Sequence, residues 1–462
     1  MKTVAIAERK AEWFGGKVII DEIREYADSR GSLAEVWRTD DDQMNEESSE
    51  HPMMCYTSIT NPFVMRGPHQ HKDQTDWFYT FKNRMAYHLY DPETDEMEVY
   101  FTDPTKITRV KVAPPIVNSY RNLEDNQIFT SNYPTSLFMG PDKSEPIDEI
   151  RWEGKYVKNQ TFVVIGANGR LGKALTNELY AQMGLHDYHV IPVYSKLHNN
   201  DEINDLFRKI DTALIDIETG KPETERVTII NCSAFADVAG ANDPSVQEKL
   251  DWSNVQMPIS LCKMSAQRDW HFIQFSSDYV YQTLKDDASI FAELGKYTKS
   301  KIDMEEGLRR SPKAMTSKTT LIRVANLFSS NDGTRHNMVK KFKKIKRNGK
   351  AFTVAPDVKL YPSDVESLSE YLVKNLADMG YNKLTSLFFN AGKLSYINLL
   401  PEKSYTIPEF IKKYFDVDDY NLYDSDVVPW WKGFEGDINT DVEVYYFKPN
   451  EQSILDIIHE GD

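Results

Sequence analysis

The run Thr161-Phe162-Val163-Val164-Ile165, followed at once by Gly166-Ala167-Asn168-Gly169-Arg170-Leu171-Gly172, decides the fold of most of this 462-residue chain. The first run predicts a buried strand, and the glycine-rich segment predicts a tight turn into a helix. Gly166 permits the turn, Gly169 lets the backbone approach a pyrophosphate, and Gly172 lets the helix pack against the strand. A diphosphate would then meet the free N–H groups at the helix N-terminus. The pattern therefore favours a dinucleotide-binding turn over a tight turn without a ligand.

Apolar, β-branched runs recur beyond this turn at helix-sized intervals, at 189–194, 227–230, 271–275 and 320–324. This rhythm predicts an α/β, doubly wound Rossmann domain whose parallel sheet is covered by helices on both faces. Near residue 400 the pattern changes to a small C-terminal part, expected to bind substrate, with one helix signal at 406–415 and Pro408 in its first turn. The acidic, aromatic stretch at 416–462 gives no readable pattern.

Two motifs further along the chain carry the chemistry of a reductase. Ser276-Ser277-Asp278-Tyr279 ends a predicted strand, and Tyr297 and Lys301 lie four residues apart on one face of a predicted helix. Hydride reduction of a ketone leaves an alkoxide that a tyrosine can protonate, and we expect the adjacent ammonium to lower the pKa of that tyrosine. Ser277 can hydrogen-bond the same oxygen. An isolated Tyr-x-x-x-Lys is usually a surface pair, but after a dinucleotide turn we predict that Ser277, Tyr297 and Lys301 are catalytic.

The residues after the second strand indicate which dinucleotide is bound. An acidic residue there usually binds the ribose 2′-hydroxyl, but this chain has Tyr194-Ser195-Lys196, with Asp201 as the first acidic residue. A hydroxyl and a cation suit a 2′-phosphate, which favours NADPH, with NADH as the alternative and an ordinary loop lysine as the plain interpretation of Lys196. The predicted cofactor-binding residues are Gly166, Asn168, Gly169, Arg170, Leu171, Gly172, Ser195, Lys196, Tyr297 and Lys301.

The N-terminal third of the sequence has a different pattern. Short alternating runs such as 75–81 and 85–90, broken by Asp-Pro turns, predict an all-β sandwich or small barrel. The pattern changes again at 153–159, which we interpret as a linker. The sequence therefore predicts two domains, residues 1–155 and residues 159–462.

Charge and cysteine content exclude several functions. The chain has 55 Lys and Arg against 71 Asp and Glu, and the net charge of −16 opposes nucleic acid or an anionic membrane as the main partner. The dense basic run at 340–347 has apolar residues three apart, as on the solvated face of a helix. Three cysteines without paired spacing fit a reducing compartment and predict neither disulfides nor a zinc site. No apolar run is long enough for a signal peptide or a membrane span, so we expect a cytoplasmic protein.

Residues 160 to about 400 resemble the extended short-chain dehydrogenase/reductase superfamily, and within it dTDP-4-dehydrorhamnose reductase. Beyond the glycine turn, the matching pieces are Asn231-Cys232-Ser233-Ala234-Phe235, Asn254, Ser277-Asp278-Tyr279-Val280-Tyr281, Tyr297 with Lys301 and Glu305, and Arg323. The resemblance implies NADPH-dependent reduction of the C4 ketone of a nucleotide-linked 4-keto-6-deoxyhexose. Ser277 stands where that family usually has threonine, which keeps the hydroxyl.

Asp28-Ser29-Arg30-Gly31-Ser32-Leu33-Ala34-Glu35 and Arg66-Gly67-Pro68-His69 resemble dTDP-4-dehydrorhamnose 3,5-epimerase, a cupin-type jelly roll, over about residues 15–150. The resemblance implies that His69 removes a proton next to a ketone and that Tyr133 returns one on the opposite face. It also implies a homodimer paired through N-terminal strands. The residues expected to contact the nucleotide diphosphate and its base are Arg30, Glu35 and Arg66, with His69 also at the substrate.

The N-terminal sequence departs from that family at two places. Where the family has a second histidine, this chain offers Asn118 or Ser119, and the aspartate that orients the base would fall in the linker, so Asp76 is a candidate substitute. His69 and His71 also admit a metal site, because His-x-His pairs bind metals. No carboxylate and third histidine appear at matching spacing, so we predict no metal. The plainest alternative is that these histidines belong to a structural barrel.

The leading interpretation is a bifunctional enzyme that epimerises a nucleotide-4-keto-6-deoxyhexose at C3, C5 or both and then reduces C4, two consecutive steps of L-rhamnose biosynthesis. A second interpretation is a reductase whose cupin domain only binds nucleotide sugar or holds an oligomer together. A third is a non-catalytic, NADP-binding regulatory subunit, and a 3,4-ketoisomerase is a further cupin possibility. The retained Ser277, Tyr297 and Lys301 argue against the regulatory subunit, because a binding module has no need for these three groups.

Overall fold

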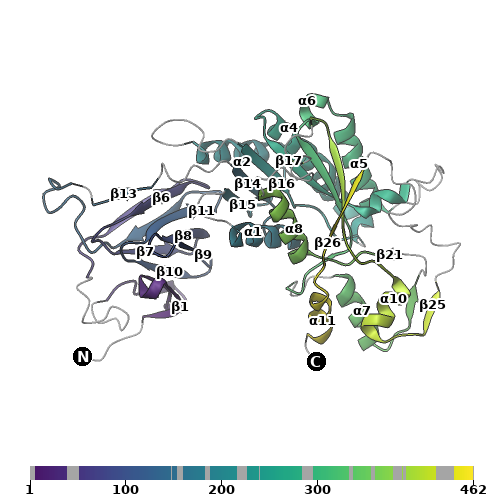
Figure 1. Cartoon of the computed structure of the whole chain (residues 1–462), viewed down its shortest axis with the longest axis horizontal. Coiled ribbons are helices and arrows are strands. Elements are labelled where there is room, and N and C mark those ends of the chain that lie inside the picture. Colours follow the sequence, from purple (N-terminus) through teal and green to yellow (C-terminus); the bar gives the residue numbers. More distant parts are fainter. Residues whose placement is uncertain are drawn as a thin grey trace. The chain divides into compact units, whose positions relative to one another are not determined.

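The computed structural model describes residues 6–38, 51–146, 148–152, 160–182, 188–215, 226–238, 240–283, 295–331, 337–354, 359–377, 388, 392–422 and 442–460. The chain divides into two compact units (Figure 1). Unit 1 comprises Met1–Asn159, Met183–Ile191 and Asp205–Glu225, and unit 2 comprises Gln160–Gln182, Pro192–Asn204 and Arg226–Asp462. The linker expected at 153–159 and much of the unreadable stretch at 416–462 lie outside the described residues.

Unit 1 is built on two antiparallel sheets. The six-stranded sheet has the order β1 (Ala7–Trp13), β2 (Val18–Ile23), β10 (Ile107–Val112), β7 (Asp76–Phe81), β12 (Ile128–Asn132) and β5 (Tyr56–Thr60). The five-stranded sheet has the order β13 (Ile150–Arg151), β6 (Met65–Gln70), β11 (Val117–Asn122), β8 (Met85–Asp91) and β9 (Glu96–Phe101). One apolar cluster joins both sheets, with Phe78 and Val110 from the first and Tyr87 and Tyr120 from the second. The all-β prediction for this part is confirmed.

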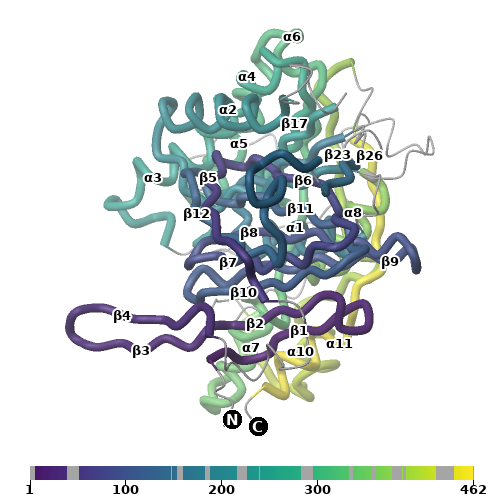
Figure 2. The backbone as a smooth tube through the Cα atoms, turned by 90° about the vertical axis from the view of Figure 1, so that its left-hand side faces the viewer, coloured from purple at the N-terminus to yellow at the C-terminus, as the bar shows by residue number. Residues whose placement is uncertain are grey.

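A hairpin extends from the sheets of unit 1. Its strands are β3 (Glu25–Asp28) and β4 (Gly31–Ala34), and Figure 2 shows it as a long loop of backbone that leaves the body of the unit. Tyr26 and Leu33 lie opposite each other on the two strands and are 59% and 62% exposed. The hairpin therefore carries an apolar pair that nothing in the described part of the chain covers.

A seven-stranded sheet lies in unit 2, apart from residues 189–191 of its first strand, which are assigned to unit 1. The order is β15 (His189–Val193), β14 (Gln160–Ile165), β16 (Arg226–Asn231), β17 (His271–Ser277), β18 (Thr319–Val324), β23 (Ser395–Pro401) and β26 (Glu443–Phe447). Neighbouring strands from β14 to β26 pair in parallel. The chain leaves β14 toward β15 on one side and returns to β16 on the other, so the strand order reverses between β14 and β16. In open α/β sheets ligands bind at this point.

Helices cover both faces of this sheet, as Figure 1 shows. α1 (Arg170–Ala181) packs against α8 (Val365–Ala377), while α4 (Met257–Ala266) and α5 (Lys296–Arg310) pack against β17. α2 (Asn200–Ala213) follows β15. The strands expected at 189–194, 227–230, 271–275 and 320–324 are β15, β16, β17 and β18, and the doubly wound prediction is confirmed.

A smaller helical part lies at the C-terminal end of unit 2. α7 (Met338–Arg347), α10 (Ile407–Phe415) and α11 (Gln452–His459) share a core that includes Phe342 and Phe410. α7 is the predicted amphipathic basic helix, and α10 is the predicted helix with Pro408 in its first turn. In the described part of the chain no helix combines the length and apolarity that crossing a membrane requires.

Candidate functional site

The glycine turn has the geometry of a dinucleotide cradle. Gly166 has a φ of +80°, and a Cβ there would lie 2.8 Å from the backbone nitrogen of Ser233, which follows β16 across the switch point. A Cβ on Gly172 would lie 2.2 Å from the carbonyl oxygen of Gly166. Gly169 caps α1 without a side chain. The backbone of the turn therefore packs so closely that Gly166 and Gly172 cannot carry a side chain without a shift of their neighbours.

The other predicted cofactor residues near this turn differ in their contacts and exposure. Asn168 donates from Nδ2 to the carbonyl oxygen of Tyr194 at 3.0 Å, and Arg170 donates from Nη1 to that of Leu327 at 2.9 Å. Leu171 is buried, so it packs inside the fold. Ser195 is half-buried and Lys196 exposed, directly after β15. The turn itself is rigidly placed, whereas Lys196 is free to adopt the position a ligand requires.

The three predicted catalytic side chains of unit 2 converge. Ser277 is the last residue of β17, and Tyr297 and Lys301 lie one turn apart on α5. The Lys301 Nζ atom is 5.9 Å from the centroid of the Tyr297 ring, and the Tyr279 ring meets that of Tyr297 edge-on at 5.6 Å. Ser277 and Lys301 are buried, and Tyr297 is half-buried.

The electrostatics of this cluster correct one expectation. Burial raises the pKa of Tyr297, and the charge of Asp278 raises it further. The expected lowering by Lys301 is not seen, since the effect of burial on Tyr297 prevails. Burial also lowers the pKa of Lys301, to about 8. Among the described residues, the charge of Glu305, one turn further along α5, opposes that lowering. Near neutral pH the phenol therefore keeps its proton, and the lysine is largely an ammonium.

An acidic residue that the sequence did not assign lies against Ser277. The Ser277 hydroxyl donates to Oδ1 of Asp278 at 2.7 Å, and burial raises the pKa of Asp278 to about 7. Asp278 follows Ser277 directly in the matched motif, but spacing alone does not show which way its side chain points. Its burial inside the site is a finding of the structure.

Polar contacts of Asn254 and Arg323 fix the position of the helix that carries Tyr297 and Lys301. Asn254 donates to the Ser300 hydroxyl at 3.0 Å and to the Phe235 carbonyl at 3.1 Å, and it lies in a π-helical segment, Trp252–Gln256. Such segments often occur at functional sites. The Arg323 guanidinium binds both carboxylate oxygens of Glu305. Asn254, Glu305 and Arg323 thus connect α5 to the segment after β16 and to β18.

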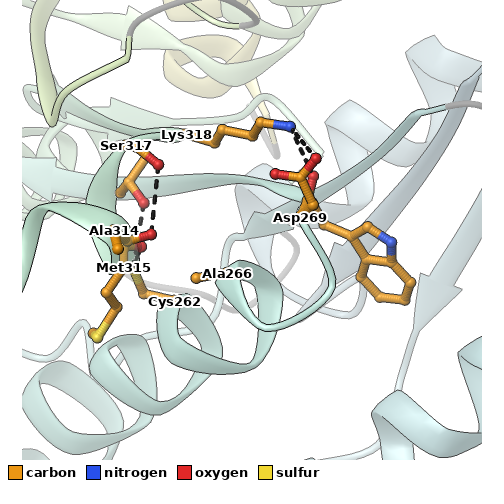
Figure 3. A pocket seen from close by; sticks show the side chains of 9 residues that line it. Cys262, Ala266, Asp269, Ala314, Met315, Ser317 and Lys318 are labelled. Atoms are coloured by element: carbon orange, nitrogen blue, oxygen red, sulfur yellow. Dashed lines mark hydrogen bonds and ion pairs between the residues drawn. The ribbon is translucent and has the colours of Figure 1, made fainter.

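A surface recess lies at the opposite end of the sheet. Figure 3 shows its lining, in which Lys318 pairs with Asp269 at 2.8 Å and the buried Cys262 contributes one wall. Asp269 and Lys318 precede β17 and β18, whereas Ser277 ends β17. Burial raises the pKa of the Cys262 thiol to about 11, so it is unreactive at neutral pH. The recess is therefore separate from the catalytic cluster.

In unit 1, His69 is placed on β6 between two neighbouring strands. It lies in register with Asn118 of β11 on one side and with Arg151 of β13 on the other. Burial lowers the pKa of His69, and the nearby carboxylate of Glu149 raises it in part. The sequence missed Glu149, because β13 reaches β6 from nearly eighty residues further along the chain.

A second group of polar residues lies beside His69. His71 donates from Nδ1 to the carbonyl oxygen of Asp148, so its Nε2 faces Oδ2 of Asp76 at 3.4 Å. Asp76 also accepts hydrogen bonds of 2.8 Å from Gln74 and Asn132. His69, His71 and Asp76 offer ligand atoms within 4.8 Å of one another. We expected Asp76 to contact His69, but its carboxylate faces His71 instead.

The remaining predicted residues of unit 1 each make polar contacts with residues other than His69. Arg30 lies at the tip of the β3–β4 hairpin, where its exposed guanidinium pairs with Asp28 at 2.6 Å, and Glu35 pairs with Arg38 at 2.9 Å. Arg66 reaches the Thr60 hydroxyl at 2.9 Å.

Two tyrosines of unit 1, Tyr133 and Tyr56, are candidates for the phenol that acts with His69. Tyr133 meets the ring of Tyr79 at 5.0 Å, and burial raises its pKa to about 12. Tyr56, which the sequence did not single out, shares with His69 the charges of Asp76 and Glu149. It is therefore a second phenol to consider beside His69.

Both parts of the chain can now be compared with known proteins. The glycine turn at the switch point and the cluster of Ser277, Tyr297 and Lys301 define unit 2 as a Rossmann-like fold of the reductase class. Residues 160–395, just over half of the chain, match the family described as "RmlD substrate binding domain". The chain belongs to this family.

Three individual proteins are similar to parts of the chain. "Probable low-salt glycan biosynthesis epimerase Agl13" of Haloferax volcanii is 29% identical over 134 residues, which are 28% of this chain and 83% of that protein. The dTDP-4-dehydrorhamnose reductase of Bacillus anthracis, solved with NADP, is 19% identical and covers 58% of this chain and 85% of its own, with a TM-score of 0.42. The dTDP-4-dehydrorhamnose 3,5-epimerase of Sulfolobus tokodaii is 15% identical and covers 32% and 81%, with a TM-score of 0.26.

Proposed function

We propose that the chain is a bifunctional nucleotide-sugar enzyme. The N-terminal part, as a cupin-type domain at 1–155, epimerises a nucleotide-linked 4-keto-6-deoxyhexose, and the part at 159–462 then reduces the C4 ketone with NADPH. The observation that carries the proposal is the convergence of Ser277, Tyr297 and Lys301 in the same unit as a glycine turn that only a side-chain-free backbone can form. The family match of residues 160–395 and the similarity to a protein named as an epimerase support it.

Epimerisation requires a neutral base beside an acidic C–H bond. The pKa of His69 is lowered by burial, so its imidazole is unprotonated near neutral pH and can accept a proton from the carbon next to the ketone. Glu149 favours the imidazolium that forms. Tyr133 would return a proton on the opposite face, and Arg30, Glu35 and Arg66 would bind the nucleotide.

Reduction requires a proton donor at the carbonyl oxygen. NADPH, when bound, supplies the hydride, and the phenol of Tyr297 supplies the proton because burial keeps it protonated. Ser277 donates a hydrogen bond to the same oxygen. The ammonium of Lys301 stabilises the phenolate that remains.

The glycine turn would bind the pyrophosphate of the cofactor at the N-terminus of α1. A hydroxyl and an exposed cation follow β15 at Ser195 and Lys196, and this pair would accept the 2′-phosphate of NADPH.

A coupled assay in heavy water tests the proposal. With a 4-keto-6-deoxyhexose nucleotide, the wild-type protein should place solvent deuterium in the sugar without NADPH and should consume NADPH when it is added. His69→Ala should lower the deuterium exchange by roughly 10²–10⁴-fold and leave the reduction of an already epimerised sugar unchanged. If His69→Ala alters neither exchange nor product stereochemistry, unit 1 only binds nucleotide sugar.

A divalent metal held by His69, His71 and Asp76 is a second candidate for unit 1, because the ligand atoms of these residues lie close together. A metal-bound His69 could not act as a base. The epimerase proposal predicts that a chelator leaves exchange unchanged and that added Zn²⁺ inhibits it; a chelator that abolishes exchange would favour the metal.

We also propose that the protein forms a homodimer through its N-terminal strands. The apolar pair of Tyr26 and Leu33 on the β3–β4 hairpin supports this, since such a surface is suited to cover by a second copy.

A further inference from the structure

Asp278 is a buried carboxyl group for which the proposed reaction has no role. Its side chain is 1% exposed, and its Oδ1 accepts the hydroxyl hydrogen of Ser277 at 2.7 Å. Its Oδ2 is buried and has no hydrogen-bond partner among the residues that the structure describes. A carboxylate with an unpaired buried oxygen is costly, whereas a carboxylic acid carries a hydrogen that it can donate.

The surroundings of Asp278 favour the protonated form. Its neighbours among the ionisable groups are two phenols, Tyr279 on the same segment and Tyr297 on α5, and the charge of Asp278 raises the pKa of both. None of the described groups that shift the pKa of Asp278 carries a positive charge. Burial raises that pKa to about 7, although hydrogen bonds from the Ser277 hydroxyl and from the backbone N–H groups of Asp278 and Tyr279 act in the opposite direction. The carboxyl group is therefore half-protonated near neutral pH.

The protonation state of Asp278 decides where the Ser277 hydroxyl points. A serine hydroxyl has one hydrogen and can also accept hydrogen bonds. When Asp278 is ionised, its carboxylate accepts the hydrogen bond of the Ser277 hydroxyl, as in the structure. Ser277 then has no hydrogen with which to donate to a ketone. When Asp278 is protonated, its own O–H can donate to Ser277 Oγ and leave the serine hydrogen free.

We propose that Asp278 acts as a carboxylic acid that directs the Ser277 hydroxyl toward the substrate ketone. It is a positioning residue, since it acts through Ser277, and this inference rests on the proposed reductase function. Asp278 keeps its proton throughout: the ketone carbon gains a hydride from NADPH, which becomes NADP⁺, and the ketone oxygen gains the phenolic proton of Tyr297. Reduction therefore requires the protonated form and weakens as Asp278 ionises.

The test is the pH dependence of kcat/KM for NADPH-dependent reduction in the wild type and in Asp278→Asn. We expect kcat/KM of the wild type to fall about tenfold per pH unit above about pH 7. Asp278→Asn should not show this decrease, because its amide can donate to Ser277 but cannot ionise. Deprotonation of Lys301 should cause a second decrease in kcat/KM at higher pH. Glu305→Gln should shift the pH of this second decrease and leave the first unchanged. An Asp278→Asn profile that falls like the wild type would overturn the inference.

A measurement without turnover separates this inference from the proposed function. Infrared difference spectra of the wild type with isotope-labelled aspartate should show a protonated carboxyl band at about pH 6 that is lost by about pH 8. If the wild type reduces no 4-keto sugar nucleotide, the proposed function fails, while this band still tests Asp278. If Asp278→Asn does not fold, the wild-type band decides alone. No aspartate band titrating in this range would overturn the inference.

Discussion

At the scale of single residues, burial sets the chemistry of both candidate sites. His69 is kept neutral, Tyr297 is kept protonated and Lys301 is brought toward neutrality, in each case because the charged form loses hydration. For His69 the charges that oppose the shift are those of Glu149 and Asp76, and for Lys301 the opposing charge is that of Glu305. Each site can therefore be tuned by changing one neighbouring charge.

The pair of Glu149 and Arg151 gives the first prediction. Glu149 raises and Arg151 lowers the pKa of His69, so Glu149→Gln should move the acid limb of the deuterium-exchange rate to lower pH and Arg151→Gln should move it to higher pH. The exchange rate measured by NMR against pH checks both. Shifts in the same direction would contradict a role of His69 as the base.

The two tyrosines of unit 1 give the second prediction. Because the base acts first, Tyr133→Phe should still exchange deuterium at the carbon but should lose inversion, by roughly 10²-fold. Tyr56→Phe is the matched variant, since Tyr56 lies among the same charges as His69. Product NMR distinguishes exchange from inversion. If Tyr56→Phe loses inversion and Tyr133→Phe does not, Tyr56 and not Tyr133 is the residue that returns the proton.

At the scale of elements, the turn between β14 and α1 is the most constrained part of unit 2. In Gly172→Ala the added methyl carbon would lie 2.2 Å from the Gly166 carbonyl oxygen, so the helix must shift. We expect NADPH affinity to fall by at least tenfold and stability by roughly 1–3 kcal/mol. Lys173→Ala, at an exposed position of the same helix, should change neither. NADPH fluorescence titration and thermal unfolding measure the two effects; wild-type affinity in Gly172→Ala would contradict the cradle.

The same elements show how far the sequence could predict the structure. Apolar runs and glycines are local signals, so β14 to β18 and the turn after β14 were predictable, as were Ser277, Tyr297 and Lys301. Glu149 was not, since β13 is two residues long and pairs with a strand far away in sequence. The burial of Asp278 and the pairing of Asp76 with His71 also depend on tertiary packing, which spacing does not encode.

At the scale of the whole molecule, we predict a dimer that depends on the exposed hairpin. Tyr26 and Leu33 are opposite each other and largely exposed, so a charge at this pair should oppose association. Leu33→Asp should therefore be monomeric by analytical ultracentrifugation, while Ser32→Asp, the neighbouring polar position, should remain dimeric. A wild type that is monomeric at micromolar concentration would contradict the proposed dimer.

The two-unit organisation also makes the central claim testable, because each unit carries its own chemistry. The most direct measurement is NMR of the product formed from a 4-keto-6-deoxyhexose nucleotide, NADPH and the full chain in heavy water. The account predicts a C4 alcohol that carries deuterium at an inverted carbon, with one NADPH consumed for each sugar. A sugar recovered with its ketone intact, its protons unexchanged and the NADPH unspent would contradict it.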